Sequence, residues 1–200
     1  MIKENEFIQN CFKELQKRHP EEFIIKSRID NISPNIRDKN DNNKWTLVES
    51  NVSAEDIANL EKKFNIELPK LYKVFISSYY YSFDELHGVL DNFLYEDDCD
   101  VFVNISDQLP GSPLSQIENT LNEFKDIIKF GYIPIGDFNS CGPICFDEVN
   151  NYKLVWLDHE EYYSCESIEE LEEVAIPIFD DFKQFMECFF CGIKHECEEI

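Results

Sequence analysis

The sequence contains little of what catalytic sites and membrane spans require. Its 200 residues include only six glycines and four histidines, and they contain no glycine-rich phosphate-binding motif, nucleophile elbow or zinc-protease motif. No apolar run approaches the roughly 18–20 residues that a transmembrane helix needs, and residues 1–20 lack the apolar segment of a signal peptide. These absences predict a soluble, non-catalytic protein that stays in the cytoplasm.

Basic residues are scarce over most of the chain. The formal net charge is −23. Residues 1–46 hold nine Lys/Arg against eight Asp/Glu, a balance of +1, whereas residues 47–200 hold nine against 33, a balance of −24. This charge disfavours nucleic acid and anionic membranes and favours a basic protein partner, although acidity can also serve solubility alone. The contrast predicts an N-terminal helical extension and linker, 1–46, followed by a main domain, 47–200.

Eight cysteines are present without a secretion signal. Disulfides are typical of small secreted proteins, so reduced thiols are the expected state. Cys141–Cys145 and Cys188–Cys191 have spacings that could suit zinc, but the second pair lies in a helical pattern, and buried cysteine packs as a small apolar residue. We expect structural thiols, with no metal and no cofactor. Pairing of His159 with Cys145 or Cys165 as a nucleophilic site is the less favoured alternative.

Two dense carboxylate groups stand out, at 97–100 and at 158–161. A calcium loop needs oxygen ligands at alternate positions and usually a turn glycine. The first group has neither the glycine nor a closing glutamate. Solvated acidic loops are therefore the expected structure, and a metal site is the alternative.

Apolar periodicity and capping residues predict the helices. A helix is expected over 5–18, ending before a proline. Ser53 and Asp56 form a variant capping box for a second helix, which is joined to a third helix beginning at Pro69. Another capping box, Ser115 with Glu118, begins a helix continuing to residue 128. A short acidic helix or turn is expected over 167–173 and a Phe-rich helix over 180–191.

Short apolar runs between turn signals predict the strands. These runs occupy 45–48, 87–95, 101–105, 132–135, 144–146, 154–157 and 162–165. The segment 136–143 connects two of them as an elaborated hairpin loop whose exposed side could contact a partner. Helices first, mostly strands next and a closing helix predict an α+β fold, with a mixed, largely antiparallel sheet flanked by helices.

Several segments, in this order, resemble the SUKH superfamily of Smi/Knr-type proteins. The resemblance begins with 53–64 and the Leu-Pro-Lys-Leu-Tyr step at 68–72, and continues through 133–137, 142–147 and 155–160. The closing Phe-rich helix also fits, so that the resemblance spans about residues 50–192. It implies a mixed sheet flanked by helices and no catalytic residues. It also implies fold-determining roles for Leu68, Pro69, Tyr72, Gly136, Gly142 and Trp156.

In bacteria, the resemblance implies an immunity protein that binds a cognate toxin. The acidity suggests that it occludes a basic active site, such as that of a nuclease. The alternative is a non-catalytic regulatory or scaffold module that binds a protein unrelated to toxins. Expected partner-binding residues are the acidic clusters with nearby aromatic anchors: Tyr95, Asp97, Asp98, Asp100, Phe138, Glu160, Glu161, Tyr162 and Tyr163.

Overall fold

A curled, seven-stranded sheet organises the protein. The computed structural model describes residues 2–25, 36–41, 43–94 and 96–197. Within these ranges the strands are β1 (Val48–Glu49), β2 (Tyr79–Tyr80), β3 (Leu86–Asp91), β4 (Cys99–Ile105), β5 (Tyr132–Phe138), β6 (Pro143–Asp147), β7 (Lys153–Leu157), β8 (Ala175–Phe179) and β9 (His195–Glu196). The main sheet has the order β8-β7-β6-β5-β4-β3-β9. Its pairs are antiparallel except for β3 with β9.

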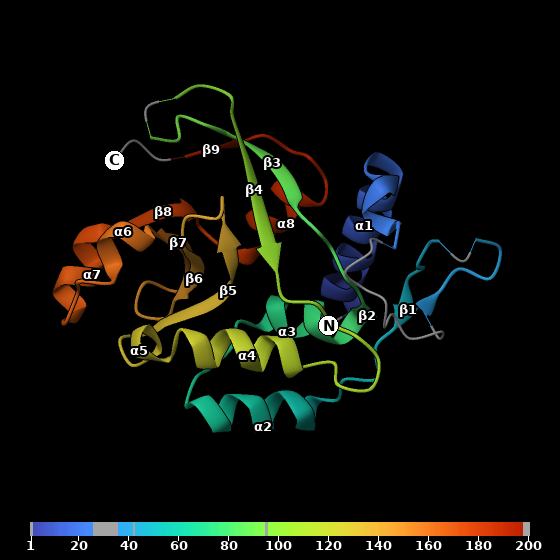
Figure 1. Ribbon diagram of the computed structural model, residues 1–200, viewed down its shortest axis with the longest axis horizontal. Helices are drawn as coiled ribbons and strands as arrows, with labels where there is room; N and C mark the ends of the chain where they lie inside the picture. Colours follow the sequence, from blue (N-terminus) through green and yellow to red (C-terminus); the bar gives the residue numbers. More distant parts are fainter. Residues whose placement is uncertain (1, 26–35, 42, 95, 198–200) are drawn as a thin grey trace.

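Helices cover this sheet (Figure 1). Those in the described ranges are α1 (Ile2–Arg18), the 3₁₀ helix η1 (Pro20–Phe23), α2 (Ala54–Phe64), α3 (Lys70–Ser78), α4 (Ser115–Glu123), α5 (Lys125–Ile128), α6 (His159–Tyr162), α7 (Ile168–Val174) and α8 (Phe182–Phe189). Helix α8 contacts β3, β7 and β8, while α1 and α3 pack on α8 and on each other. Helices α4 and α5 pack against β5. The predicted α+β class is therefore confirmed.

The start of α2 follows the predicted capping box. The Ser53 hydroxyl accepts the backbone N–H of Asp56 at 3.1 Å, and the Asp56 carboxylate accepts the N–H of Ser53 at 2.8 Å. The helix ends at Asn65, which has a left-handed backbone with φ of 53°. Local side-chain chemistry thus sets both ends of this helix.

The N-terminal segment packs into the same core as the sheet. Phe12 of α1 is fully buried and contacts Phe75 and Phe190, at ring-centroid distances of 5.6 and 5.4 Å. Phe23 stacks on Trp45 at 4.5 Å, and the Trp45 indole N–H donates to the backbone oxygen of Glu22. The division of the chain at residue 46 stays a prediction, which these contacts make testable.

Three local predictions were wrong. Residues 162–165 do not form a strand, because the Asp158 side chain accepts the N–H of Glu160 and begins α6 instead. Ser115 does not cap α4: it is the first residue of the helix, and its hydroxyl donates to the backbone oxygen of Ser112. The expected continuous helix over 115–128 divides at Phe124 into α4 and α5.

Strand positions near residue 45 also differ from the prediction. Trp45 makes only an isolated bridge with Arg37, and the regular strand begins at Val48. Strands β2, β8 and β9 were not predicted at all. Among the described helices, none has the length and apolar composition to cross a membrane.

Candidate functional site

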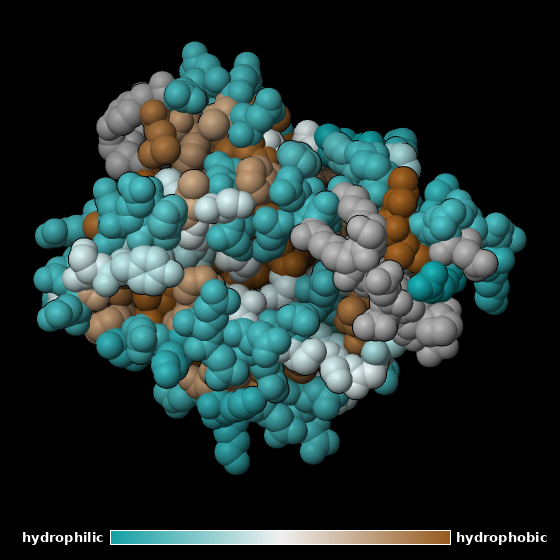
Figure 2. All heavy atoms as spheres, in the orientation of Figure 1, coloured by the Kyte–Doolittle hydropathy of each residue, from teal (hydrophilic) through white to brown (hydrophobic). Residues whose placement is uncertain are grey.

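An open cleft of about 760 Å³ lies where the residues before β3, the end of β4 and the second half of β5 meet α4. The side chain of Glu22 from η1 borders it. We call this site the acidic cleft because six of its lining residues are carboxylates: Glu22, Asp84, Glu85, Asp107, Glu123 and Asp137. No lysine or arginine of the described residues lines it. On the face drawn in Figure 2, hydrophilic side chains cover most of the surface and apolar ones gather in separate areas.

Two polar atoms in the acidic cleft are buried without a partner in the described part of the chain. Ser82 is only 3% exposed, and its hydroxyl makes no hydrogen bond. One carboxylate oxygen of Asp137, Oδ1, is also buried and unpaired. Buried polar atoms normally have a hydrogen-bond partner. These two atoms are therefore polar groups that the described part of the chain leaves unsatisfied.

The carboxylate of Asp137 is held by the β5–β6 loop. It accepts hydrogen bonds from the backbone N–H groups of Ser140 and Gly142. Partial burial raises the pKa of Asp137, and these two hydrogen bonds oppose the increase. A cation placed against Asp137 would reduce the cost of its burial, since an opposite charge favours the ionised form.

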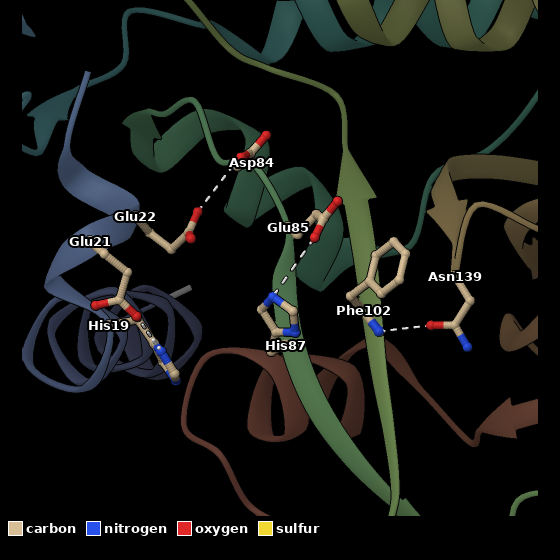
Figure 3. Close-up of polar contacts among 8 residues, drawn as sticks. All are labelled: His19, Glu21, Glu22, Asp84, Glu85, His87, Phe102 and Asn139. Atoms are coloured by element: carbon tan, nitrogen blue, oxygen red, sulfur yellow. Dashed lines mark hydrogen bonds and ion pairs between the residues drawn. The ribbon is translucent and has the colours of Figure 1, made fainter. Parts of the chain in front are cut away.

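The opposite side of the cleft is fixed by η1 and the chain entering β3. The backbone N–H of Asp84 donates to the Glu22 carboxylate at 3.1 Å (Figure 3). Glu85 lies 3.9 Å from the His87 imidazole nitrogen, on the outer face of β3. Across the cleft, the hydroxyls of Ser106 and Thr120 lie 2.8 Å apart and tie the segment after β4 to α4. The acidic side chains are thus held by several elements of the fold.

The chemistry of the cleft suits an organic cation better than a metal ion. Within the described residues, no group of three or more His, Cys, Asp or Glu side chains is arranged to hold a metal. The cleft also has apolar walls, from Phe83, Ile105, Leu109 and Phe124. Dispersed carboxylates beside apolar surface can accept several hydrogen bonds from one extended cationic group.

In each of the two cysteine pairs one member is buried, Cys145 or Cys188, and the other is partly exposed, Cys141 or Cys191. Cys145 is fully buried, and burial raises the pKa of its thiol well above the usual value. Cys188 is 1% exposed, and burial raises its pKa to about 12. Cys191 lies 3.4 Å from Cys11, sulfur to sulfur, between α8 and α1. Thiols in such environments are weak nucleophiles because the thiolate is disfavoured.

The first predicted acidic group lies away from the cleft, at the turn between β3 and β4. Asp97, Asp98 and Asp100 are exposed there. Lys194 partly offsets their charge, since its ammonium group lies 2.6 Å from Asp98 and 2.7 Å from Asp91. Tyr95, the predicted aromatic anchor of this group, lies outside the described residues.

The second predicted group is on α6. Glu160 and Glu161 are exposed, and Tyr163 is 74% exposed and stacks on Tyr162 at 4.4 Å. Figure 1 shows α6 beside α7 and β8, whereas the β3–β4 turn projects from another side of the sheet. The two predicted acidic groups thus lie on different elements and do not form the acidic cleft.

Two of the predicted aromatic anchors are buried, which corrects their assignment to a binding surface. Phe138 is 0% exposed and packs against Phe93 and Trp156 inside the sheet. Tyr162 is 6% exposed and belongs to a second apolar cluster that includes Leu157. The alternation of side chains along β5 turns Phe138 inward. Because both rings are buried, neither can reach a partner in the folded protein.

The two glycines of the predicted fold-determining set stand where a side chain would collide with backbone. A Cβ atom on Gly136 would meet the carbonyl oxygen of Asn104 on β4. A Cβ atom on Gly142 would meet the carbonyl oxygen of Leu157, and its φ of 133° disfavours other residues. Because neither residue has a Cβ atom, neighbouring backbone segments of the same chain can approach closely.

The other positions in that set have packing or capping contacts. Leu68 is buried, and its backbone N–H donates to the Glu61 carboxylate at 2.7 Å. Pro69 follows it as the N-cap residue of α3. Tyr72 is also buried and makes edge-to-face contacts with neighbouring aromatic rings. Trp156 is 7% exposed, and its indole N–H is buried without a partner among the described residues.

Sequence reasoning identified none of the cleft carboxylates as site residues. They come from segments far apart in the chain, and each looks like an ordinary acidic surface residue in its local sequence. Asp137 was included only within the loop 136–143 and the resembling segment 133–137, without a binding role of its own. The available signal was its position between two glycines at a strand end, where strained turns often carry function.

The fold and the net charge of −23 define a class, an acidic α+β domain. A family model for the SMI1 / KNR4 family (SUKH-1) matches residues 51–188, and the chain belongs to this family. Members are generally immunity proteins of polymorphic toxin systems, typically non-catalytic, and they bind cognate toxins. No curated protein shows significant similarity to the chain. The matched region begins after α1 and ends within α8.

Proposed function

We propose that this protein is an immunity protein that binds a cognate toxin and occludes a basic site on it, such as a nuclease active site. The acidic cleft carries the proposal, because it gathers six carboxylates and no lysine or arginine of the described residues. Enzymes that bind nucleic acid present basic surfaces to its phosphates. A carboxylate-lined surface can occupy such a site in place of the substrate.

The net charge of −23 supports the same function through the rate of association. Complementary potentials can raise association rate constants toward roughly 10⁸–10⁹ M⁻¹s⁻¹ at low salt. The exposed carboxylates of the β3–β4 turn and α6 extend this field beyond the cleft. We include Asp97, Asp98, Asp100, Glu160, Glu161 and Tyr163 in the proposed partner-binding surface.

Co-expression with a candidate toxin tests the proposal. Toxin genes are taken from the neighbourhood of the gene for this chain, and both growth rescue and formation of a purified complex are scored. We expect rescue together with a stable complex. If the folded protein neither rescues growth nor binds any neighbouring toxin, the immunity function is wrong. Stable binding to a non-toxic protein instead would favour the regulatory alternative.

A pair of charge-reversal variants locates the binding surface. Glu123→Lys changes the cleft, whereas Glu55→Lys makes the same change on the exposed side of α2. Both alter the net charge equally, so they have similar effects on the overall field. We expect Glu123→Lys to weaken toxin binding much more strongly. Equal losses would show that general acidity, and not the cleft, determines binding.

A further inference from the structure

The acidic cleft contains acceptors that the rest of the fold leaves unused. Ser82 Oγ and Asp137 Oδ1 are both buried and unpartnered within the described residues. Both residues line the same cleft. A buried polar group without a partner costs stability. Both atoms have almost no accessible surface in the free protein, so a ligand in the cleft would supply the missing donors only after neighbouring side chains move aside.

We propose that the acidic cleft receives the guanidinium group of an arginine side chain presented by the basic partner. This inference rests on the proposed function only for the identity of that partner. Ser82, Glu85, Glu123 and Asp137 are the residues that carry it. They provide one buried hydroxyl and three carboxylates around the cleft.

Guanidinium fits this site better than ammonium for two physical reasons. Its five N–H donors are fixed in a plane, so they can bond to carboxylates and to a hydroxyl at the same time. It is also weakly hydrated and packs on aromatic rings. Phe124, which is only partly buried, supplies aromatic surface in the cleft. An ammonium group has three donors, is strongly hydrated and gains less from apolar walls.

The size of the cleft and the absence of a metal cluster agree with a side chain as occupant. A volume of about 760 Å³ exceeds what a single bare ion fills. No metal-binding group is arranged among the described residues. The openness of the cleft toward solvent allows a side chain on a protruding loop to enter. The remaining space accommodates the neighbouring residues of that loop.

Peptide titration followed by NMR tests the proposal without requiring a toxin. The probes are capped peptides Arg-Gly-Arg, Lys-Gly-Lys and citrulline-Gly-citrulline, added to the isotope-labelled full chain. We expect the arginine peptide to shift backbone amides around Ser82 and Asp137. It should bind at least severalfold more tightly than the lysine peptide, and the citrulline peptide should cause no shifts. Equal binding of arginine and lysine, or shifts only outside the cleft, would overturn the proposal.

Two variants test the named acceptors. Ser82→Ala removes the hydroxyl with little change in volume, and Asp137→Asn removes the charge at nearly constant shape. Each variant should bind the arginine peptide roughly tenfold more weakly, because each change removes a hydrogen bond that involves a charged group. Glu55→Gln on α2 is the control and should bind as the unmodified chain does. If folded Ser82→Ala and Asp137→Asn both bind the peptide normally, the assignment is wrong.

The peptide titration and the toxin co-expression test can fail separately. Arginine-specific binding in the cleft, combined with failure to rescue from any toxin, would support the cleft assignment and reject the proposed function. Growth rescue that Asp137→Asn and Ser82→Ala leave unchanged would reject the assignment and keep the function.

Discussion

Removing the ring of Phe12 is expected to destabilise the whole protein, not only its first helix. Phe12 is 0% exposed and lies within about 5–6 Å of the rings of Phe75, Tyr79, Tyr81, Phe83 and Phe190, centroid to centroid. Phe-to-Ala changes in a core cost about 3–5 kcal/mol. We expect the upper part of this range, because five rings lose one neighbour and aromatic pairs contribute beyond buried area.

Thermal and chemical unfolding measure this effect. For a chain of this size each kcal/mol lowers the melting temperature by about 2–4 °C, so a cost of about 4–5 kcal/mol for Phe12→Ala should lower it by roughly 8–20 °C. Far-ultraviolet circular dichroism and tryptophan fluorescence should report one shared transition. Lys13→Ala, an exposed neighbour on the same helix, is the control and should change little. A normal melting temperature, or separate loss of α1 before the core, would refute the reasoning and favour an independent N-terminal unit.

Three further changes test other features of the fold. Gly142→Ala should cost at least about 1–3 kcal/mol in chemical denaturation, because it strains the backbone and meets the Leu157 carbonyl; unchanged stability would contradict the close approach. Ser53→Ala should cost about 1 kcal/mol by loss of the helix cap. The hydrogen bonds from Ser53 lower the pKa of Asp56, so the stability that the Asp56 carboxylate contributes should persist at neutral pH. It should be lost only as the pH falls below 3.8 and the carboxylate protonates. Loss of this stability at higher pH would contradict the prediction. Burial and nearby carboxylates raise the pKa of Cys165, so iodoacetamide should alkylate it more slowly at pH 8 than a free-cysteine peptide, and faster at high salt. Reaction as fast as the peptide, tracked by mass spectrometry, would refute this.

Sequence signals succeeded where structure depends on neighbouring residues. The α2 capping box needs only Ser53 and Asp56, three residues apart, and it occurs in the structure as predicted. The Phe-rich helix near the C-terminus was also recognisable, because apolar side chains recur at helical spacing. The strands β5, β6 and β7 are short apolar runs between turns, which is also a local pattern.

Predictions failed where distant contacts decide the structure. Strand β9 has two residues and exists because Leu90 of β3 pairs with His195. The Tyr162 ring becomes buried because α6 packs it against a cluster formed by other elements, which its acidic local sequence does not reveal. Phe138 is the last residue of β5, which was predicted to end at residue 135, so its ring was expected on an exposed loop and lies inside the sheet.

The candidate site was the least predictable part for the same reason. Its carboxylates come from η1, the chain before β3, the chain after β4, α4 and β5. Only Asp84 and Glu85 are neighbours in the sequence. The unpaired hydroxyl of Ser82 has no sequence signature, because its burial depends on packing. Net charge predicts a basic partner, and only the fold shows that these carboxylates line one cleft.

The total charge and the acidic cleft should act at different stages of binding. At physiological ionic strength, exposed charges are screened beyond roughly 8 Å. The carboxylates of the β3–β4 turn and α6 therefore guide encounter most effectively at low salt. Ser82 and Asp137 are partly or fully shielded from water, so contacts to them are screened much less. Salt should then slow association while changing dissociation little, and variants in the cleft should do the reverse. Under the proposed function, we therefore expect specificity for one basic partner to reside in the few buried acceptors of the cleft, since the exposed carboxylates would attract any cationic surface.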